Sequence, residues 1–431
     1  MAQEHDNPGF AGSRRFVVAA LGTSQTLAWA SSYYLPAILA DPIAGGIGVP
    51  RSWVFAALSG ALLIAAFAGP AVGRVIDRHG GRGVLVLSNV VLAAGLIALA
   101  AANGAVLLFA AWAILGIGMT LGLYDAGFAA LTALYGRDAR GPITGITLIA
   151  GFASTVSWPL STFLNDTLGW RETLLVWAAL NLAIALPLNW MLPVPARPMQ
   201  LAHTAEHSTG WKPYKEMFLL AFVFAAAWFV TGSMAAYLPG LLERCGVTPL
   251  QAIAAASLVG PAQVAARLVE FFLLRRSHPL ISARLAALLH PIGAAIFAVV
   301  GPSAAVTFAI FYGAGNGLLT IARGTVPLAV FGPHGYGERT GLLGAPARAA
   351  QALAPLLFGL LLDATGPSAT SYPWLCVSLR LPRCSGCVRL ATAWTDCEKQ
   401  NAPGIARGVA VSSARLLSVG RRRCAAASGT G

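Results

Sequence analysis

The chain has 431 residues, of which 57% are hydrophobic and only 10% are charged, and its formal net charge is +13. A soluble domain carries about 25% charged residues, so this composition excludes an ordinary water-soluble protein and makes the lipid bilayer the expected partner. The positive charge does not indicate nucleic-acid binding, because its distribution along the chain follows the membrane topology described below.

Apolar runs of the length needed for a membrane-spanning helix, about 20 residues, recur along most of the chain. They are continuously apolar rather than alternating, which favours helices over a β-barrel and predicts an all-α membrane protein. No small-residue cleavage site follows the first run, so we interpret it as a retained helix and not a signal peptide. The eleven runs lie near residues 16–40, 52–73, 84–102, 105–133, 142–164, 171–192, 216–240, 250–274, 284–300, 303–331 and 341–362.

A short charged turn joins the second and third runs and contains Gly73, Asp77, Arg78, Gly80 and Arg82. Two long apolar helices with so short a connection form an antiparallel pair, and an aspartate there can accept hydrogen bonds and hold helices together. In these residues the chain resembles the major facilitator superfamily, whose loop between helices 2 and 3 has the pattern G-x-x-x-D-R-x-G-R-R. The alternative is a positively charged cytoplasmic loop of an unrelated membrane protein.

The two halves of the chain repeat each other. Four short patterns recur in the same order, offset by 191–203 residues: Tyr34-Leu35-Pro36 and Tyr237-Leu238-Pro239, Gly69-Pro70 and Gly260-Pro261, Gly116 with Gly118 and Gly313 with Gly315, and Thr144-Gly145 and Thr340-Gly341. Repeated halves are typical of secondary transporters, which bind substrate at the interface between the halves. The resemblance, over about residues 14–370, implies two pseudo-symmetric six-helix bundles with helices 1, 4, 7 and 10 lining a central cavity.

This organisation predicts four parts of the chain. They are an N-terminal bundle (1–192), a polar linker (193–215), a C-terminal bundle (216–370) and a basic tail (371–431) that holds five of the six cysteines. A twelfth helix is expected after residue 366, yet no apolar run follows. We interpret the tail as the product of a shifted reading frame. A genuine basic tail and a small zinc module at Cys384 and Cys387 are the alternatives, and the lack of histidines in the tail disfavours zinc.

The distribution of Lys and Arg predicts an inner-membrane protein with a cytoplasmic N-terminus. With that orientation the cytoplasmic segments up to residue 340 hold fourteen Lys and Arg residues, whereas the outer loops hold three, Arg51, Arg171 and Arg244. This is the bias expected from the positive-inside rule.

Charged residues inside membrane helices are costly, so each is a candidate functional residue. Asp125 lies in the fourth run, and Arg323 lies at a similar depth in the tenth. The two can meet across the pseudo-two-fold axis and form a gate, Arg323 can bind an anionic substrate, and Asp125 can take up a coupling proton. The alternative for each is a structural salt bridge. Arg348 either adds to this anion-attracting field or extends to the inner surface, and we favour the second interpretation.

Arg267 and Glu270 are spaced to pair on one helix face, and we interpret them as a structural clip. Polar and aromatic residues complete the set of candidate substrate-binding or gating residues. Gln25, Trp29 and Tyr33 are four residues apart and form one stripe on the first helix, and the remaining candidates are Tyr237 and Asn316. Helix packing is the alternative role for any of these side chains.

The sequence thus predicts a secondary transporter that moves a small solute by alternating access. A phosphate-binding loop for ATP is absent, which leaves an ion gradient or a counter-substrate as the driving force. Positive charges outnumber negative ones within the helices, which favours a proton-coupled carrier of organic anions. The alternatives are an efflux carrier for drugs or metabolites and a non-functional truncated product. The scattered histidines and carboxylates indicate no enzyme, no metal site and no cofactor.

Overall fold

The computed structural model describes residues 13–195, 212–274 and 277–365, and within these ranges all regular elements are helical. The expected all-α architecture is therefore confirmed. The segment after residue 366, where the twelfth helix is predicted to be missing or altered, and the tail from residue 371, with its alternatives, lie outside the described residues.

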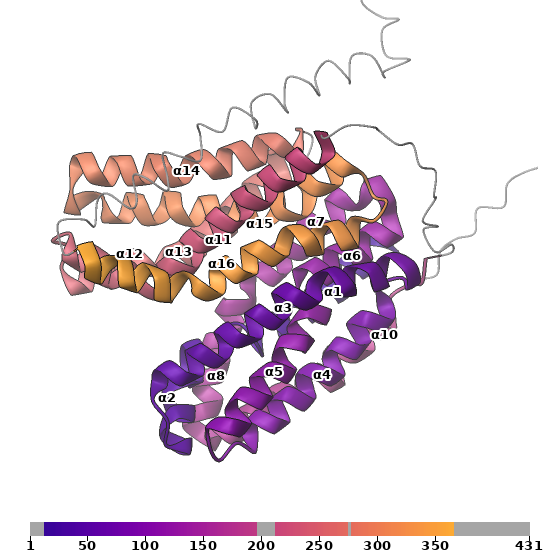
Figure 1. The fold of residues 1–431 in the computed structure, drawn as a ribbon, viewed down its shortest axis with the longest axis horizontal. Coiled ribbons are helices and arrows are strands. Elements are labelled where there is room, and N and C mark those ends of the chain that lie inside the picture. Colours follow the sequence, from indigo (N-terminus) through magenta and orange to yellow (C-terminus); the bar gives the residue numbers. More distant parts are fainter. Residues whose placement is uncertain (1–12, 196–211, 275–276, 366–431) are drawn as a thin grey trace, which may run out of the picture. The chain divides into compact units, whose positions relative to one another are not determined.

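The first half consists of α1 to α10 (Figure 1), with α3, α4 and α5 packed along one another. A long cluster of buried apolar side chains, which includes Trp112 and Trp177, joins these helices. The bounds are α1 Arg14–Ala30, α2 Pro36–Ile47, α3 Arg51–His79, α4 Arg82–Ala100, α5 Ala105–Gly122, α6 Tyr124–Tyr135, η2 Gly136–Ala139, α7 Arg140–Ile149, η3 Ala150–Phe152, α8 Ala153–Leu168, α9 Trp170–Leu180, η4 Asn181–Ala185 and α10 Leu186–Trp190.

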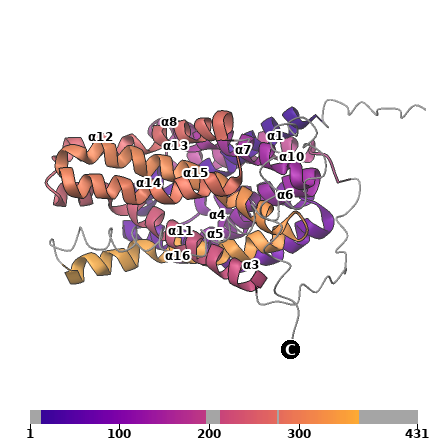
Figure 2. The same cartoon turned by 90° about the horizontal axis from the view of Figure 1, so that it is seen from above.

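The second half consists of α11 to α16. Helices α14 and α15 lie side by side, and α11 packs along α16 (Figure 2). The bounds are α11 Lys212–Arg244, α12 Pro249–Ser257, α13 Val259–Val269, η5 Glu270–Leu274, α14 Pro279–Val300, η6 Pro302–Ala304, α15 Ala305–Phe331 and α16 Tyr336–Thr365.

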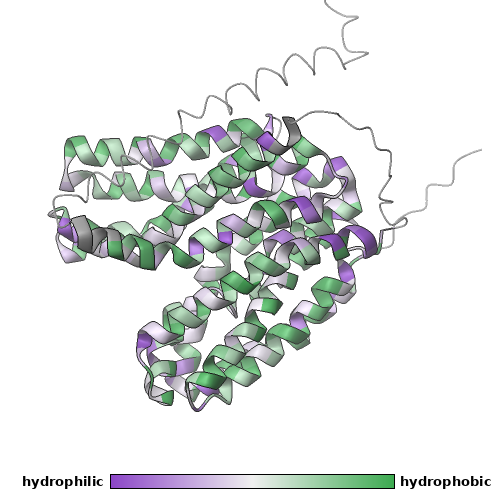
Figure 3. Ribbon diagram, in the orientation of Figure 1, coloured by the Kyte–Doolittle hydropathy of each residue, from purple (hydrophilic) through white to green (hydrophobic). Residues whose placement is uncertain are grey.

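The helices are apolar along much of their length (Figure 3). Many of their large apolar side chains are exposed rather than covered by protein. Phe67, Val106 and Val299 are each more than four-fifths exposed, as expected for side chains that contact lipid. Eight helical stretches among the described residues are long and apolar enough to cross a membrane. Two of the eleven predicted runs, 16–40 and 341–362, are not among these stretches but are helical.

Several predicted runs are interrupted in the structure, among them the first and the fourth. The first run ends as a helix at Ala30, and a new helix, α2, starts at Pro36. Pro36 occupies the first position of α2, where its missing N–H costs no hydrogen bond. The fourth run breaks at Leu123, whose backbone is extended, so Asp125 lies in the first turn of α6 rather than inside one long helix.

Repeated glycines allow helices to cross closely in both halves. A Cβ atom at Gly116 would overlap the backbone of α3 at Ala61, and one at Gly313 would overlap the backbone of α13 at Val259. These glycines therefore serve close contact between helices. The equivalent contacts in the two halves bring α5 against α3 and α15 against α13.

Candidate functional site

Asp125 is held where one helix stops and another starts. Its carboxylate lies in the first turn of α6, where unpaired backbone N–H groups and the helix dipole favour a negative charge. Gln25 of α1 supports the break from the other side, because its side-chain amide donates to the carbonyl oxygen of Gly122 over 2.5 Å. Gln25 therefore helps to position the site and does not line the cavity described below.

Two arginines of the second half bind the same oxygen of Asp125. Arg323 of α15 donates from Nη2 to Oδ2 over 2.7 Å, and Arg348 of α16 pairs with the same Oδ2 atom. The three side chains are only 11–14% exposed. The predicted meeting of Asp125 and Arg323 across the two halves is thus present in the structure.

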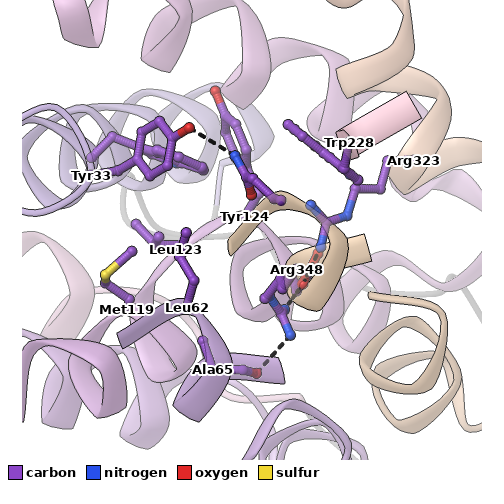
Figure 4. A pocket seen from close by; sticks show the side chains of 12 residues that line it. Tyr33, Leu62, Ala65, Met119, Leu123, Tyr124, Trp228, Arg323 and Arg348 are labelled. Atoms are coloured by element: carbon purple, nitrogen blue, oxygen red, sulfur yellow. Dashed lines mark hydrogen bonds and ion pairs between the residues drawn. The ribbon is translucent and has the colours of Figure 1, made fainter. Parts of the chain in front are cut away.

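The interpretation of Arg348 as a side chain that extends to the inner surface is wrong. Its guanidinium stays inside the protein because it has two partners there, the carboxylate of Asp125 and the carbonyl oxygen of Ala65 in α3, at 2.8 Å (Figure 4). Arg323 has an aromatic partner as well, since its guanidinium carbon lies 5.2 Å from the ring centre of Trp228. Both arginines are fixed in position by contacts other than the one to Asp125.

The three charges do not cancel. Two guanidinium groups against one carboxylate leave a net charge of +1 in a region shielded from water. Such an excess is costly in a low-dielectric interior unless a further anion compensates it. The arrangement therefore has the electrostatic properties of an anion-binding site.

A cavity adjoins these charges and has aromatic walls (Figure 4). Together with the open solvent at its mouth, the empty space here is about 460 Å³. The indole N–H groups of Trp29 and Trp228 are buried and have no hydrogen-bond partner among the described residues. The lining side chains are Trp29, Tyr33, Leu62, Ala65, Met119, Leu123, Tyr124, Asp125, Trp228, Arg323, Arg348 and Gln351.

Polar contacts also join the two halves across this cavity. The side-chain amide of Gln351 donates to the hydroxyl oxygen of Tyr33 over 2.8 Å. Trp29 packs on Tyr33 and Tyr124, with ring centres 5.4 and 5.0 Å apart. Gln351 is a site residue that was not predicted, although its position three residues after Arg348 places both side chains on one face of α16. Leu62 and Met119 were not predicted either, because nothing in the sequence distinguishes them from other apolar residues.

Besides Gln25, two further predicted site residues lie apart from the cavity lining. Tyr237 donates its hydroxyl hydrogen to the carbonyl oxygen of Pro355 over 2.9 Å, which joins α11 to α16. Asn316 accepts a hydrogen bond from Thr231 over 3.0 Å. Both contacts connect helices of the second half.

The last turns of α3, which carry most of the charged motif, bind the start of α16. The carboxylate of Asp77 accepts hydrogen bonds from the backbone N–H groups of Gly337, at 2.8 Å, and Glu338, at 2.9 Å. A Cβ atom at Gly73 would overlap the carbonyl group of Gly337, so the two helices need glycine at this crossing. Gly80 ends α3 with φ of +81°, a conformation that favours glycine. We call this contact between Asp77 and the first turn of α16 the α3–α16 latch.

The other members of the loop motif lie beside this latch. Arg82 places its guanidinium 5.8 Å from the ring centre of Trp190. Arg78 is exposed. Arg74, which lies between two motif positions, pairs with Glu338 at 3.6 Å.

A second contact between the halves contradicts the expected pairing of Arg267 with Glu270. Glu270 is fully buried, and its carboxylate pairs with Arg140 of α7 at 3.2 Å. Arg140 also donates to the carbonyl oxygens of Leu274, at 3.0 Å, and Ser277. Glu270 and Arg267 are three residues apart and could pair, but Glu270 pairs instead with Arg140 of the other half. Arg140 also caps the carbonyl end of this helix, which favours its position there. We call this contact the α7–η5 latch.

The comparisons with known proteins bear on the whole fold. A family model for the Major Facilitator Superfamily matches residues 21–334. The chain belongs to this superfamily. It is therefore a multi-pass membrane protein of a family of secondary transporters, as the loop motif and the repeated halves predicted.

Solved structures agree with this membership. The human organic anion transporter MFSD10 (TETRAN) is 18% identical with a TM-score of 0.66, and the match covers 85% of this chain and 98% of that one. The proton:xylose symporter XylE is 13% identical with a TM-score of 0.65, and the match covers 86% and 95%. At these identities the likeness is one of fold.

A curated relative matches over a shorter range. It is described as an uncharacterized 38 kDa protein in the 23S RNA operon of Thermoproteus tenax, and it is 32% identical over 135 residues. The match spans 31% of this chain and about a third (35%) of the relative.

Proposed function

We propose that this protein is a proton-coupled carrier that moves a small organic anion across the inner membrane by alternating access. The observation that carries the proposal is the shared oxygen of Asp125, bound by Arg323 and Arg348 beside an aromatic cavity. Planar guanidinium groups suit carboxylate ligands, and the aromatic walls suit the organic part of such a ligand.

Asp125 acts in this proposal as an internal substitute for the substrate. Without substrate, its carboxylate partly compensates the two arginines. A substrate carboxylate that enters the cavity finds the same two guanidinium groups and competes with Asp125 for them. Binding then exchanges one charge-assisted pair for another, which limits the cost of removing the substrate anion from water.

Proton coupling follows from this competition. Once the substrate carboxylate holds the arginines, Asp125 loses the interactions that favour its charged form, so it binds a proton more readily. By linkage, protonation of Asp125 strengthens substrate binding by the same factor. The substrate and the proton therefore bind and leave together.

The two latches fit the role of gates. With the N-terminus in the cytoplasm, as the positive-inside bias favours, both the α3–α16 latch and the α7–η5 latch lie at the cytoplasmic end. Their closure leaves the cavity without access from the cytoplasm, and their opening is the step that releases substrate there. Gly73, Asp77 and Gly80 then serve the change of conformation and not substrate contact.

The proposal is tested with the purified full chain in proteoliposomes. We expect a pH gradient that is acidic outside the vesicles to drive accumulation of a labelled monocarboxylate such as benzoate inside them, at a rate above that of protein-free vesicles. Arg323→Ala abolishes this transport and leaves membrane insertion intact. Asp125→Asn abolishes accumulation driven by the gradient but retains exchange of labelled for unlabelled substrate. Transport at wild-type rates in Arg323→Ala contradicts the anion site, and accumulation by Asp125→Asn contradicts the proton site.

A further inference from the structure

Arg267 is a buried cation that the site described so far does not use. It is 5% exposed, and the structure pairs it with no carboxylate among the residues it describes. Its hydrogen bonds run to Gln263 and Thr320, both at 3.4 Å, longer than most bonds of this kind. Its Nε atom has no partner.

The other embedded charges show how unusual this is. Arg323 and Arg348 share Asp125, and Arg140 pairs with Glu270. A guanidinium group without a counter-charge is costly in a protein interior. Of the embedded arginines, Arg267 therefore gains most from binding an anion.

Arg267 lies at the interface between the halves. Its α13 helix belongs to the second half, and its Nη1 atom reaches Gly151 of the first half so closely that a Cβ atom there would overlap it. Gly151 thus leaves room for the guanidinium group. A movement of the halves relative to each other changes the surroundings of this charge.

Helix α15 connects Arg267 to the Asp125 site. Thr320, the hydrogen-bond partner of Arg267, lies three residues before Arg323 on α15, and such residues are neighbours about 5–6 Å apart on a helix face. The residue that binds Arg267 and the residue that binds Asp125 therefore lie one helix turn apart on α15.

We propose that Arg267 binds a second anionic group of the transported solute, so that the substrate is a small organic dianion such as a dicarboxylate. This rests on the proposed function, in which the first carboxylate binds Arg323 and Arg348. The net charge of the protein groups matches a dianion, because three arginines and one ionised Asp125 leave a net charge of +2 near the cavity. A dianion whose carboxylates are a few bonds apart spans the two cationic groups.

The test compares ligands that differ by one charge. Linear dicarboxylates from malonate to adipate are measured against their monoamides, which have the same size and one carboxylate fewer, for binding to the purified full chain. In the wild type, the best-fitting dicarboxylate binds about tenfold or more tightly than its monoamide, as expected for a charge-assisted pair. In Arg267→Gln the two ligands bind about equally, and binding of the monoamide is unchanged.

Control variants separate this result from a loss of folding. Arg51→Gln removes an arginine that is paired with Asp41 at the surface, and it retains the wild-type preference. Arg267→Lys keeps the charge and an intermediate preference. If Arg267→Gln does not fold, the affinity ratio of dicarboxylate to monoamide is compared between the wild type and Arg267→Lys. A lower ratio in Arg267→Lys supports the inference, and an unchanged ratio contradicts it.

Three results would overturn the inference. Equal binding of dicarboxylates and monoamides by the wild type removes its basis, although the proposed function stands if both bind. A preference that survives in Arg267→Gln assigns the second carboxylate to another residue. A monocarboxylate that binds the wild type only with chloride, with this need lost in Arg267→Gln, shows that Arg267 binds a separate inorganic anion. Failure of every carboxylate to bind instead contradicts the proposed function itself.

Discussion

Replacement of Asp125 by asparagine is expected to destabilise the empty protein and to strengthen anion binding. Asparagine has the same size but no charge. Asp125 accepts two charge-assisted bonds, from Arg323 and Arg348, which contribute about 1.5–3 kcal/mol each, against about 0.5–1.5 kcal/mol for neutral bonds. The loss from both bonds together is about 2–3 kcal/mol, and removal of one partner from a buried ion pair costs about 3–5 kcal/mol.

The same substitution leaves two arginines without an internal competitor. A ligand carboxylate then gains their full attraction, so benzoate should bind Asp125→Asn more tightly than the wild type. Each tenfold gain in affinity adds about 1.4 kcal/mol to the stabilisation at a saturating ligand concentration. Benzoate should therefore return most of the stability that the variant has lost.

Thermal unfolding of the full chain in detergent, followed by tryptophan fluorescence with and without benzoate, measures both effects. Asp41→Asn is the matched control, because Asp41 also pairs with an arginine, at 2.9 Å, but its side chain is 73% exposed. A surface pair contributes about 0–1 kcal/mol, so this control should unfold close to the wild type and respond to benzoate in the same way. If Asp125→Asn is less stable but benzoate stabilises it no more than the wild type, the three charges form a structural salt bridge and our reasoning is wrong.

Three further predictions concern the latches and the helix contacts. Gly73→Ala should destabilise the protein by about 1–3 kcal/mol because the new methyl group overlaps α16, whereas Gly83→Ala, which meets nothing, should not; chemical denaturation in detergent compares the two. Arg140→Gln should cost about 3–5 kcal/mol by leaving Glu270 buried and unpaired, and the double variant with Glu270→Gln should regain part of that stability; a double variant as unstable as the single one argues against the pair. Tyr237→Phe should lower stability by about 1 kcal/mol and keep substrate affinity, and a large loss of affinity would return Tyr237 to the binding site.

The sequence predicted the parts of the site that depend on pattern. The loop motif identified Gly73 and Asp77. Glycine at that spacing indicates that two helices cross closely, and a single carboxylate beside it indicates a hydrogen-bond acceptor. The positions of Asp125 and Arg323 in equivalent runs of the repeated halves predicted that they meet. In both cases the information is local or is repeated at a fixed offset, so it can be read without a structure.

The contacts that the sequence did not predict depend on the packing of distant helices. The break at Leu123 has no proline to mark it, and it moves Asp125 to a helix start. The position of Arg348 near a helix end predicted that its side chain reaches the inner surface. The carbonyl oxygen of Ala65 and the carboxylate of Asp125 hold the guanidinium group inside instead. Glu270 pairs with Arg140 and not with Arg267, and Arg140 also donates to the carbonyl oxygen of Leu274 at the end of the same helix.

Helix α16 joins the candidate site to the α3–α16 latch. Its first turn binds Asp77, whereas Arg348, eleven residues after Gly337, binds Asp125, so the two contacts are roughly 16 Å apart along one helix. Of the contacts that α16 makes with the first half, only the one to Asp125 can be replaced by a ligand carboxylate. The contact of Arg348 with Ala65 and that of Gln351 with Tyr33 remain when this exchange occurs. A ligand that binds Arg348 can thus remove one bond between the halves while the others still hold α16, and this weakens the interface without opening it.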